Sequence, residues 1–169
     1  AQIAFGTISL VEPSYFIYSD PHQNFDMGLR GYYLFQQLQK RYIMEPVEDI
    51  RYFDGEKLVS TSEAILRDVY KDNRLSVRFA NGLVVYVNVN WDGKHWIVQD
   101  RGQEYNLPPG GWLARQGDDF FEFAGMVNGR RVDFVDSPAY VYLDGHGASV
   151  AINGHTATNQ YVKIKTGRK

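Results

Sequence analysis

Carboxylates are the side chains of this sequence best suited to catalysis. The chain has no cysteine, which excludes thiol nucleophiles, disulfides and thiolate metal sites. It also has no Gly-x-Ser-x-Gly elbow and no phosphate-binding loop. General acid and base chemistry needs carboxylates that meet in space, and for each candidate an exposed side chain or a helix cap is the simpler interpretation. The candidates are Glu12, Asp20, Glu45, Asp49, Asp118 and Asp119.

Glu12 has the least ordinary setting among these carboxylates. It follows an apolar run, "IAFGTISL" at residues 3–10, that reads as a strand, and it precedes a predicted helix. A barrel enzyme places its site-forming loops in that position. The pattern makes Glu12 the first catalytic or binding candidate of the chain.

Three tryptophans are a second kind of candidate, because an aromatic ring offers a flat surface to the C–H face of a sugar. Trp96 and Trp112 alternate with other residues of predicted strands, so core packing is the better interpretation for them. Trp91 lies in the turn "NWDGK", where packing and ligand contact remain equally open.

Neither a cofactor nor a metal site is predicted. The segment Gly145–His146–Gly147 looks like the start of a dinucleotide loop, but it follows a strand without opening a helix, so a turn between strands is favoured. The four histidines show none of the short spacings of zinc sites, and solvated or singly hydrogen-bonded side chains are expected.

Composition narrows the possible partners. The net charge of -2 provides no basic surface for nucleic acid, and no apolar run approaches the ~20 residues that a membrane span requires. Aromatic residues make up 15% of the chain, which suits strands and surfaces that stack on flat ligands.

A helix is predicted from Phe25 to Ile43. Asp20 is a suitable N-cap with Pro21 at the first helical position, and Asn24 is an alternative cap. Apolar residues cover most of the helix circumference, and Gly28 and Gly31 suggest close approach of a neighbour. We therefore expect cover on more than one side, supplied by a larger body that precedes this chain.

The rest of the chain predicts short antiparallel strands. A strand pair turns at Asp54-Gly55, and the capping-box spacing of Ser60 and Glu63 starts a helix expected over residues 61–70. Eight or nine strands follow from Arg74, with Asn81-Gly82 expected to form a type I′ turn. The expected strands are "RLSVRFA", "LVVYVNV", "HWIVQ", "GWLARQ", "FFEFAGMV", "RRVDFVD", "AYVYLDG", "ASVAIN" and "QYVKIK". The strand after this turn is apolar on both faces and should be central. These features predict a mainly β chain with an antiparallel β-sandwich at 74–169, a connecting segment at 48–73 and a strand-helix segment at 1–47.

Several phrases of the sequence together resemble the C-terminal end of bacterial (β/α)8-barrel glycoside hydrolases. They are "AFG", "GYYLFQQLQKRY", "IRYFDG", "LVSTSEAI", "FANGLVVYVNVN" and "LPPGGWLAR". In that family the last barrel strand and helix lead into an accessory β-sandwich domain. The resemblance runs from Ile3 to about Phe134 and includes no catalytic residue.

The resemblance implies that residues 1–47 are the last βα unit of a barrel. It implies that catalytic carboxylates lie on earlier strands outside this chain, so that the chain alone is inert. Carbohydrate is the implied ligand, with Glu12, Tyr15 and Trp91 as binding candidates, and the rest of the parent polypeptide is the implied partner of the Phe25–Ile43 helix. A bacterial, extracytoplasmic or secreted protein is also implied. The alternative is a free-standing β module that binds carbohydrate or another protein, in which this helix folds back on the chain's own sheet.

Overall fold

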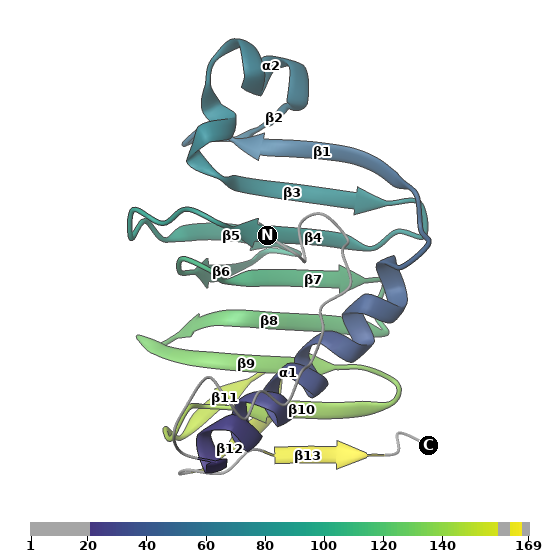
Figure 1. Cartoon of the computed structure of the whole chain (residues 1–169), viewed down its shortest axis with the longest axis vertical. Helices are drawn as coiled ribbons and strands as arrows, with labels where there is room; N and C mark the ends of the chain where they lie inside the picture. The colour runs from purple at the N-terminus through teal and green to yellow at the C-terminus, as the bar shows by residue number, and fades with distance from the viewer. Residues whose placement is uncertain (1–20, 159–162, 167–169) are drawn as a thin grey trace.

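The computed structural model describes residues 21–158 and 163–166. A long helix, α1 (Pro21–Tyr42), lies obliquely across one face of a curled antiparallel sheet (Figure 1). The mainly β, antiparallel and sandwich-like fold predicted from the sequence is therefore confirmed. The strand expected at residues 3–10 lies outside the described residues.

The main sheet has 11 strands, and its principal order is β13-β10-β9-β8-β7-β4-β3-β1-β2. The β5–β6 hairpin joins it through one pairing, Asn106 with Met126, and β11 and β12 form a separate hairpin. The strands are β1 (Val47–Phe53), β2 (Leu58–Ser60), β3 (Arg74–Phe79), β4 (Val84–Asn88), β5 (Trp96–Asp100), β6 (Gln103–Leu107), β7 (Trp112–Gln116), β8 (Phe120–Val127), β9 (Arg130–Asp136), β10 (Tyr140–Asp144), β11 (Val150–Ile152), β12 (His155–Ala157) and β13 (Lys163–Thr166).

The sheet has an apolar core on each face. On one face, Leu34, Leu38 and Tyr42 of α1 are buried against side chains of β3, β4 and β7. On the other face, the β5–β6 and β11–β12 hairpins cover the sheet, and Trp96 and Val150 belong to that second core. Strand β4 lies between β3 and β7 and contributes to both cores, which confirms its predicted central position.

Helix α1 begins at Pro21, the first of the two starts that the sequence offered, rather than at Phe25, and it packs on the chain's own sheet. Its outward side retains exposed apolar groups at Tyr32 and, just beyond its end, at Ile43 and Met44. Among the described residues, no atom beyond the helix's own backbone would lie within 4 Å of a Cβ placed at Gly28, so close packing with them does not explain that glycine. No helix among the described residues is long and apolar enough to span a membrane.

The capping box starts a shorter helix than the sequence predicts. The Ser60 side chain accepts a hydrogen bond from the Glu63 amide, and α2 spans Thr61–Leu66. A 3₁₀ helix, Val69–Asp72, follows after Asp68, whose φ is 58°. This left-handed residue ends the α-helical path, which is why the predicted helix over 61–70 is divided in two.

The Asn81-Gly82 hairpin is present, but its turn type was predicted wrongly. Gly82 has a positive φ of 81°, and its backbone amide donates a hydrogen bond to the Phe79 carbonyl. The φ of Asn81 is not positive, whereas a type I′ turn would require a positive value there. These features describe a three-residue loop with glycine at its left-handed position. The Asn81 side chain donates to the Arg41 carbonyl at 2.6 Å and accepts from the Leu83 amide, so the hairpin fixes the C-terminal end of α1. Its role is structural.

Candidate functional site

Four polar side chains meet between α1 and the sheet, and we call them the Asp133 cluster: Arg30, Asp133, Asp144 and His146. Arg30 comes from α1, and Asp133 and Asp144 are paired directly across β9 and β10. Arg30 Nε donates to Asp133 Oδ2, and His146 Nε2 lies 2.8 Å from the same oxygen. Two segments, α1 and the turn after β10, therefore converge on one buried carboxylate of β9.

The turn after β10 aims His146 at this carboxylate. Asp144 Oδ1 accepts a hydrogen bond from the His146 backbone amide at 2.7 Å, and His146 has a φ of 51°. Asx turns of this kind let a short acidic side chain shape the following backbone. The turn thus places the imidazole over the sheet, with about a third of its side chain exposed.

The pKa of Asp133 is lowered despite the burial of its side chain. Burial alone raises the pKa of its carboxyl, but hydrogen bonds from His146 and Arg30 outweigh that effect and leave the pKa below its ordinary value. Both bonds fall on Oδ2. The other oxygen, Oδ1, is buried and makes no hydrogen bond within the described part of the chain.

Glu122, on the neighbouring strand β8, is a second buried carboxyl on the same face. Trp112 Nε1 donates to its Oε1 atom at 2.6 Å, and its Oε2 atom has no hydrogen-bond partner among the described residues. Burial raises the pKa of Glu122 well above the ordinary range, the Trp112 bond lowers it, and the nearby Asp133 charge raises it further. Two buried carboxyls on one face of the sheet therefore have pKa values shifted in opposite directions.

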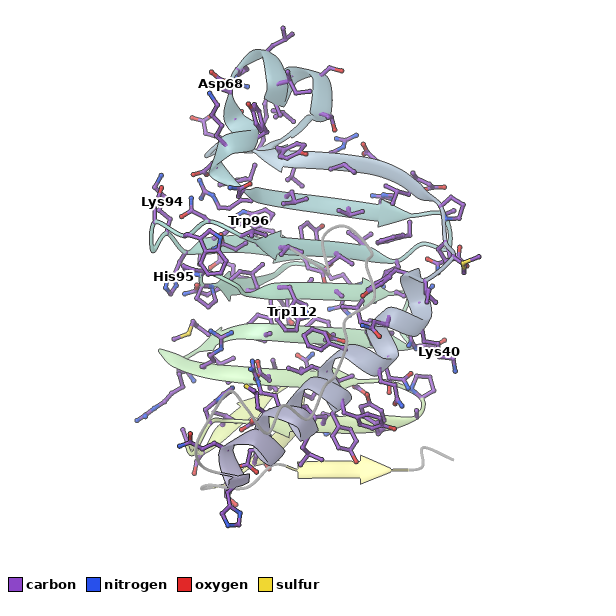
Figure 2. The ribbon with its side chains drawn as sticks, viewed as in Figure 1. Lys40, Asp68, Lys94, His95, Trp96 and Trp112 are labelled. Atoms are coloured by element: carbon purple, nitrogen blue, oxygen red, sulfur yellow. The ribbon has the colours of Figure 1, made fainter. Side chains whose placement is uncertain are left out.

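The connection between β4 and β5, residues 88–95, forms the second candidate region, and we call it the Trp91 loop. It leaves the sheet at the end of β4, where Figure 2 shows Lys94 and His95 far from Lys40, which lies beside the opposite end of the strands. Trp91 is 78% exposed, whereas Trp96 and Trp112 are buried at 3% and 6%. The packing predicted for the latter two is confirmed.

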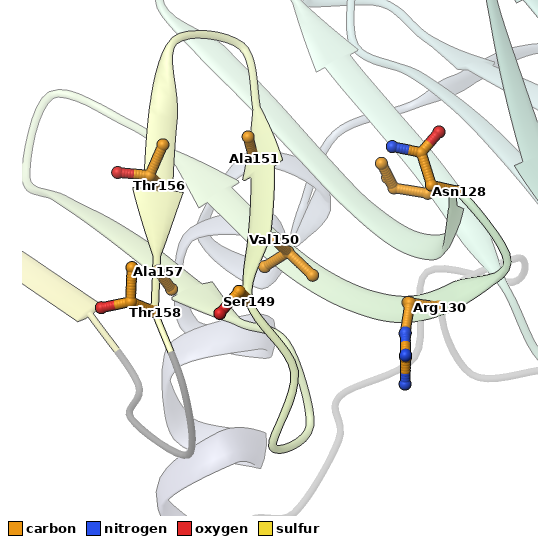
Figure 3. A pocket seen from close by; sticks show the side chains of 9 residues that line it. Asn128, Arg130, Ser149, Val150, Ala151, Thr156, Ala157 and Thr158 are labelled. Carbon is orange, nitrogen blue, oxygen red and sulfur yellow. The ribbon is translucent and has the colours of Figure 1, made fainter.

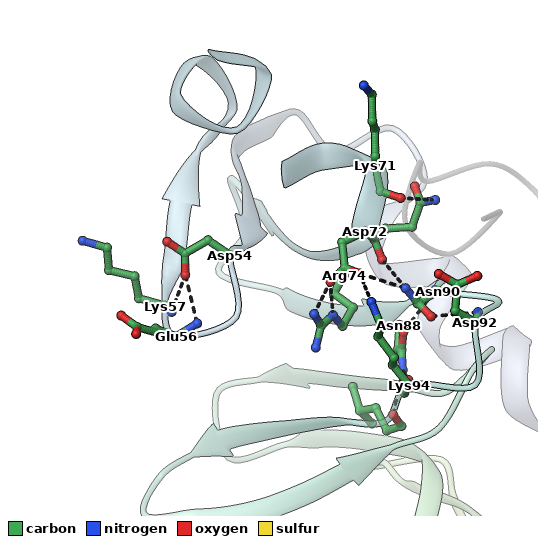
Figure 4. A network of polar contacts seen from close by, with 12 residues as sticks. Asp54, Glu56, Lys57, Lys71, Asp72, Arg74, Asn88, Asn90, Asp92 and Lys94 are labelled. Atoms are coloured by element: carbon green, nitrogen blue, oxygen red, sulfur yellow. Dashed lines mark hydrogen bonds and ion pairs between the residues drawn. The ribbon is translucent and has the colours of Figure 1, made fainter. Parts of the chain in front are cut away.

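Two buried asparagines hold the Trp91 loop in shape (Figure 4). The Asn88 amide group donates to the Lys94 and Leu107 carbonyls at 2.9 and 2.8 Å, and its oxygen accepts from the Asn90 amide. Asn90 in turn donates to the backbone and side chain of Asp72 and accepts from the Asp92 amide. Every donor and acceptor of these two side chains is oriented toward the loop or its supports. Trp91 is therefore displayed on an ordered base.

Of the three binding residues predicted from the sequence, Trp91 alone lies among the described residues. Glu12 and Tyr15 lie outside those residues, as does the carboxylate candidate Asp20. Asp118 and Asp49 pair with Arg101 and Arg51 at the surface, which fits their simpler interpretation as exposed carboxylates. The Gly145–Gly147 segment is a turn between β10 and β11, as predicted.

Sequence reasoning missed Asp133 and Glu122, although each interrupts an apolar strand. In "FFEFAGMV" and "RRVDFVD", Glu122 and Asp133 each stand between two buried neighbours. A carboxylate in such a run must find partners or lose its charge. That signal marks the two residues, but their partners Arg30 and Trp112 come from other elements and follow from the tertiary fold.

Two grooves of about 360 Å³ open on the surface. One lies between the β8–β9 turn and the β11–β12 hairpin (Figure 3), with a lining mainly of small aliphatic and hydroxyl groups that includes Asn128, Arg130, Val150 and Thr156. The other borders the C-terminal half of α1 at Lys40 and Arg41, and Gln116 of β7 also lines it. Neither lining contains an aromatic ring, so Trp91 remains the flat surface best suited to a sugar.

Comparison with known proteins does not assign the chain to a family. No family model matches the sequence, and neither a curated protein nor a solved structure matches it significantly.

Proposed function

We propose that this chain is the accessory β domain of a carbohydrate-active glycoside hydrolase, and that it contacts carbohydrate through Trp91. Trp91 is the observation that supports the proposal, because its side chain is 78% exposed on a loop whose base is fixed by buried asparagines. A rigid aromatic ring loses little conformational entropy on binding and offers apolar area to a sugar face. The assignment to a hydrolase rests on the sequence resemblance.

The domain contributes no acid/base pair of its own in this proposal. A hydrolase of this class works through two carboxyl groups on opposite sides of the scissile bond. The buried pair, Glu122 and Asp133, is covered by α1 and occupied by internal contacts. The catalytic carboxylates then belong to the preceding part of the parent enzyme, and we expect no hydrolysis of aryl glycosides or polysaccharides by this chain alone.

The exposed apolar groups at the outer side of α1 are the contact that we assign to the parent enzyme. Tyr32 is 47% exposed and Ile43 41% exposed, and Met44 follows with 95% of its surface free. Burying such groups against a second body is favourable by about 25 cal/mol per Å² of apolar surface. The remainder of the parent polypeptide is the proposed occupant.

A free-standing carbohydrate-binding module is the second candidate function. The observation that favours it is the packing of Leu34, Leu38 and Tyr42 on the chain's own sheet, because that alternative predicts a helix folded back on its sheet. The intact mass of the native protein separates the two candidates. Several hundred additional residues favour the hydrolase domain, and a mass near 19.4 kDa favours the module.

Carbohydrate contact is tested by affinity electrophoresis of the chain in gels containing single polysaccharides. We expect at least one polysaccharide to retard the wild-type chain and Trp91→Ala to migrate as in a plain gel. Met44→Ala is the matched control, because Met44 is also exposed but precedes β1 at the opposite end of the strands, where Val47 pairs with Phe79. Equal retardation of the Trp91→Ala variant contradicts the proposal.

A further inference from the structure

The Asp133 cluster brings two carboxyl groups, Asp133 and Asp144, together with one guanidinium, that of Arg30. Asp133 has no exposed surface, and its Oδ1 atom makes no hydrogen bond within the described residues. Buried carboxylate oxygens are almost always satisfied in folded proteins, so an unsatisfied one needs an explanation.

The donor atoms of the cluster have the spacing of a metal-ligand set. One ligand atom from each of Asp133, Asp144 and His146 lies within 4.8 Å of the other two. The set combines one imidazole nitrogen with two carboxylate oxygens. Nitrogen and oxygen ligands together suit zinc and neighbouring divalent transition metals, whereas magnesium and calcium prefer oxygen alone.

The three ligands are positioned by rigid parts of the fold. Asp133 and Asp144 are directly paired on adjacent strands, and the turn that carries His146 is fixed by the bond from its own amide to Asp144. Ligands held by strands and by a hydrogen-bonded turn need little reorganisation to bind an ion. The unsatisfied Oδ1 atom and this preorganised set are two separate observations that indicate the same ligand.

We propose that Asp133, Asp144 and His146 form a binding site for one divalent transition-metal ion, and that Arg30 supplies the compensating charge when the ion is absent. Binding requires His146 to present the lone pair of Nε2, so its proton then sits on Nδ1. The Arg30 side chain is one-third exposed and can turn toward solvent as the ion replaces it. Three protein ligands leave a coordination position for water, as in open zinc sites.

A substitution at Arg30 distinguishes a metal site from an ordinary buried ion pair. If Arg30 competes with the ion, Arg30→Met removes the competing charge, and zinc should bind at least tenfold more tightly. If the cluster is only an ion pair, the variant loses stability and gains no affinity for metal.

The test is calorimetric titration of the metal-free chain with zinc chloride, beside thermal melts with and without zinc. We expect one saturable site per chain, a higher melting temperature with zinc, and weaker binding of magnesium. Asp144→Asn and His146→Gln should each weaken zinc binding at least tenfold. Asp144 is only partly buried, so its variant should fold and keep the test decisive even if a change at Asp133 prevents folding.

His155→Gln is the matched control, because His155 also lies beside an aspartate, 3.9 Å from Asp136, but belongs to no three-ligand set among the described residues. Zinc affinity should be unchanged in this variant. The proposal is overturned if the wild-type chain shows no saturable zinc binding, or if Asp144→Asn and His146→Gln bind zinc as tightly as the wild-type chain.

Discussion

The Trp91 loop and the Asp133 cluster are both polar regions at the same end of the sheet, but their buried polar groups differ in how fully they are hydrogen-bonded. The cross-strand register links them, because Val87 of β4 is connected through Trp112 and Ala124 to Asp133 and Asp144. In the loop, both buried asparagines use their amide and carbonyl groups fully. In the cluster, one buried oxygen remains without a donor among the described residues.

This difference indicates two uses of buried polar groups. A fully hydrogen-bonded network fixes a backbone shape, and in the loop that shape displays an exposed indole. A network with an unfilled acceptor retains capacity for a ligand, and in the cluster the acceptor is a carboxylate oxygen. We expect changes in the loop to alter stability and shape, and changes in the cluster to alter charge balance and metal affinity.

The largest loss of stability is expected for Asn88→Ala. The change removes three hydrogen bonds, two of which are buried, and leaves the Leu107 carbonyl and the Asn90 amide without their Asn88 partner. Each buried group left unsatisfied costs about 1–3 kcal/mol, so a loss of about 4 kcal/mol is expected. Urea denaturation measures it, and a loss below about 1 kcal/mol contradicts the structural role assigned to this network.

Arg30→Met is expected to cost about 3 kcal/mol in the absence of metal, because breaking a buried ion pair leaves an uncompensated charge. Zinc should restore part of this loss if the cluster binds it. Arg51→Met is the control, since Arg51 pairs with Asp49 at the exposed surface, where an ion pair is worth about 0–1 kcal/mol. Equal losses in the two variants would contradict the burial argument.

Glu122→Gln tests how the buried Glu122 carboxyl makes folding stability depend on pH. The pKa of Glu122 in the folded chain is raised well above 4.5, so the folded state binds more protons than the unfolded state above that pH. Stability from this residue is therefore full below pH 4.5 and decreases as pH rises toward the folded pKa, by up to about 1.4 kcal/mol per pH unit. The Gln variant lacks this term.

Denaturation of both proteins between pH 5 and 8 measures the effect. We expect the stability of Glu122→Gln relative to the wild-type chain to increase with pH. A constant difference over this range would show that Glu122 ionises normally despite its burial.

The smallest effect on stability is expected for Trp91→Ala. An exposed side chain outside the core usually changes stability by less than about 0.5 kcal/mol. Carbohydrate binding should nevertheless be lost, which would show that Trp91 serves ligand contact and does not stabilise the loop. A stability loss of several kcal/mol would instead show that Trp91 is part of the loop's scaffold.

Local signals predicted the elements of the fold more successfully than their partners. Pro21 and Ser60 marked two helix starts correctly, because N1 and N-cap preferences act within one turn of the chain. Strand β6, "QEYNL", was missed because only Tyr105 and Leu107 in it are apolar, and its packing depends on β5. Short β12 was missed for the same reason, since its pairing with β11 supplies what its own composition lacks.

The candidate sites show the same limit. The turn around Trp91 is visible in the sequence, and its exposure agrees with one of the two interpretations left open there. The Asp133 cluster joins residues up to 116 positions apart, from Arg30 to His146, and only the register of β9 and β10 and the crossing of α1 bring them together. Spacing along the chain contains no trace of that contact.

The most direct test of the proposed function is tryptophan fluorescence during titration with the polysaccharides that retard the chain in gels. Since Trp96 and Trp112 are buried, an added glycan can reach only the Trp91 indole among the three. We predict a saturable blue shift and reduced acrylamide quenching in the wild-type chain. Neither change should occur in Trp91→Phe, in which only the two buried tryptophans emit. Unchanged wild-type emission with every retarding polysaccharide would contradict carbohydrate contact at Trp91.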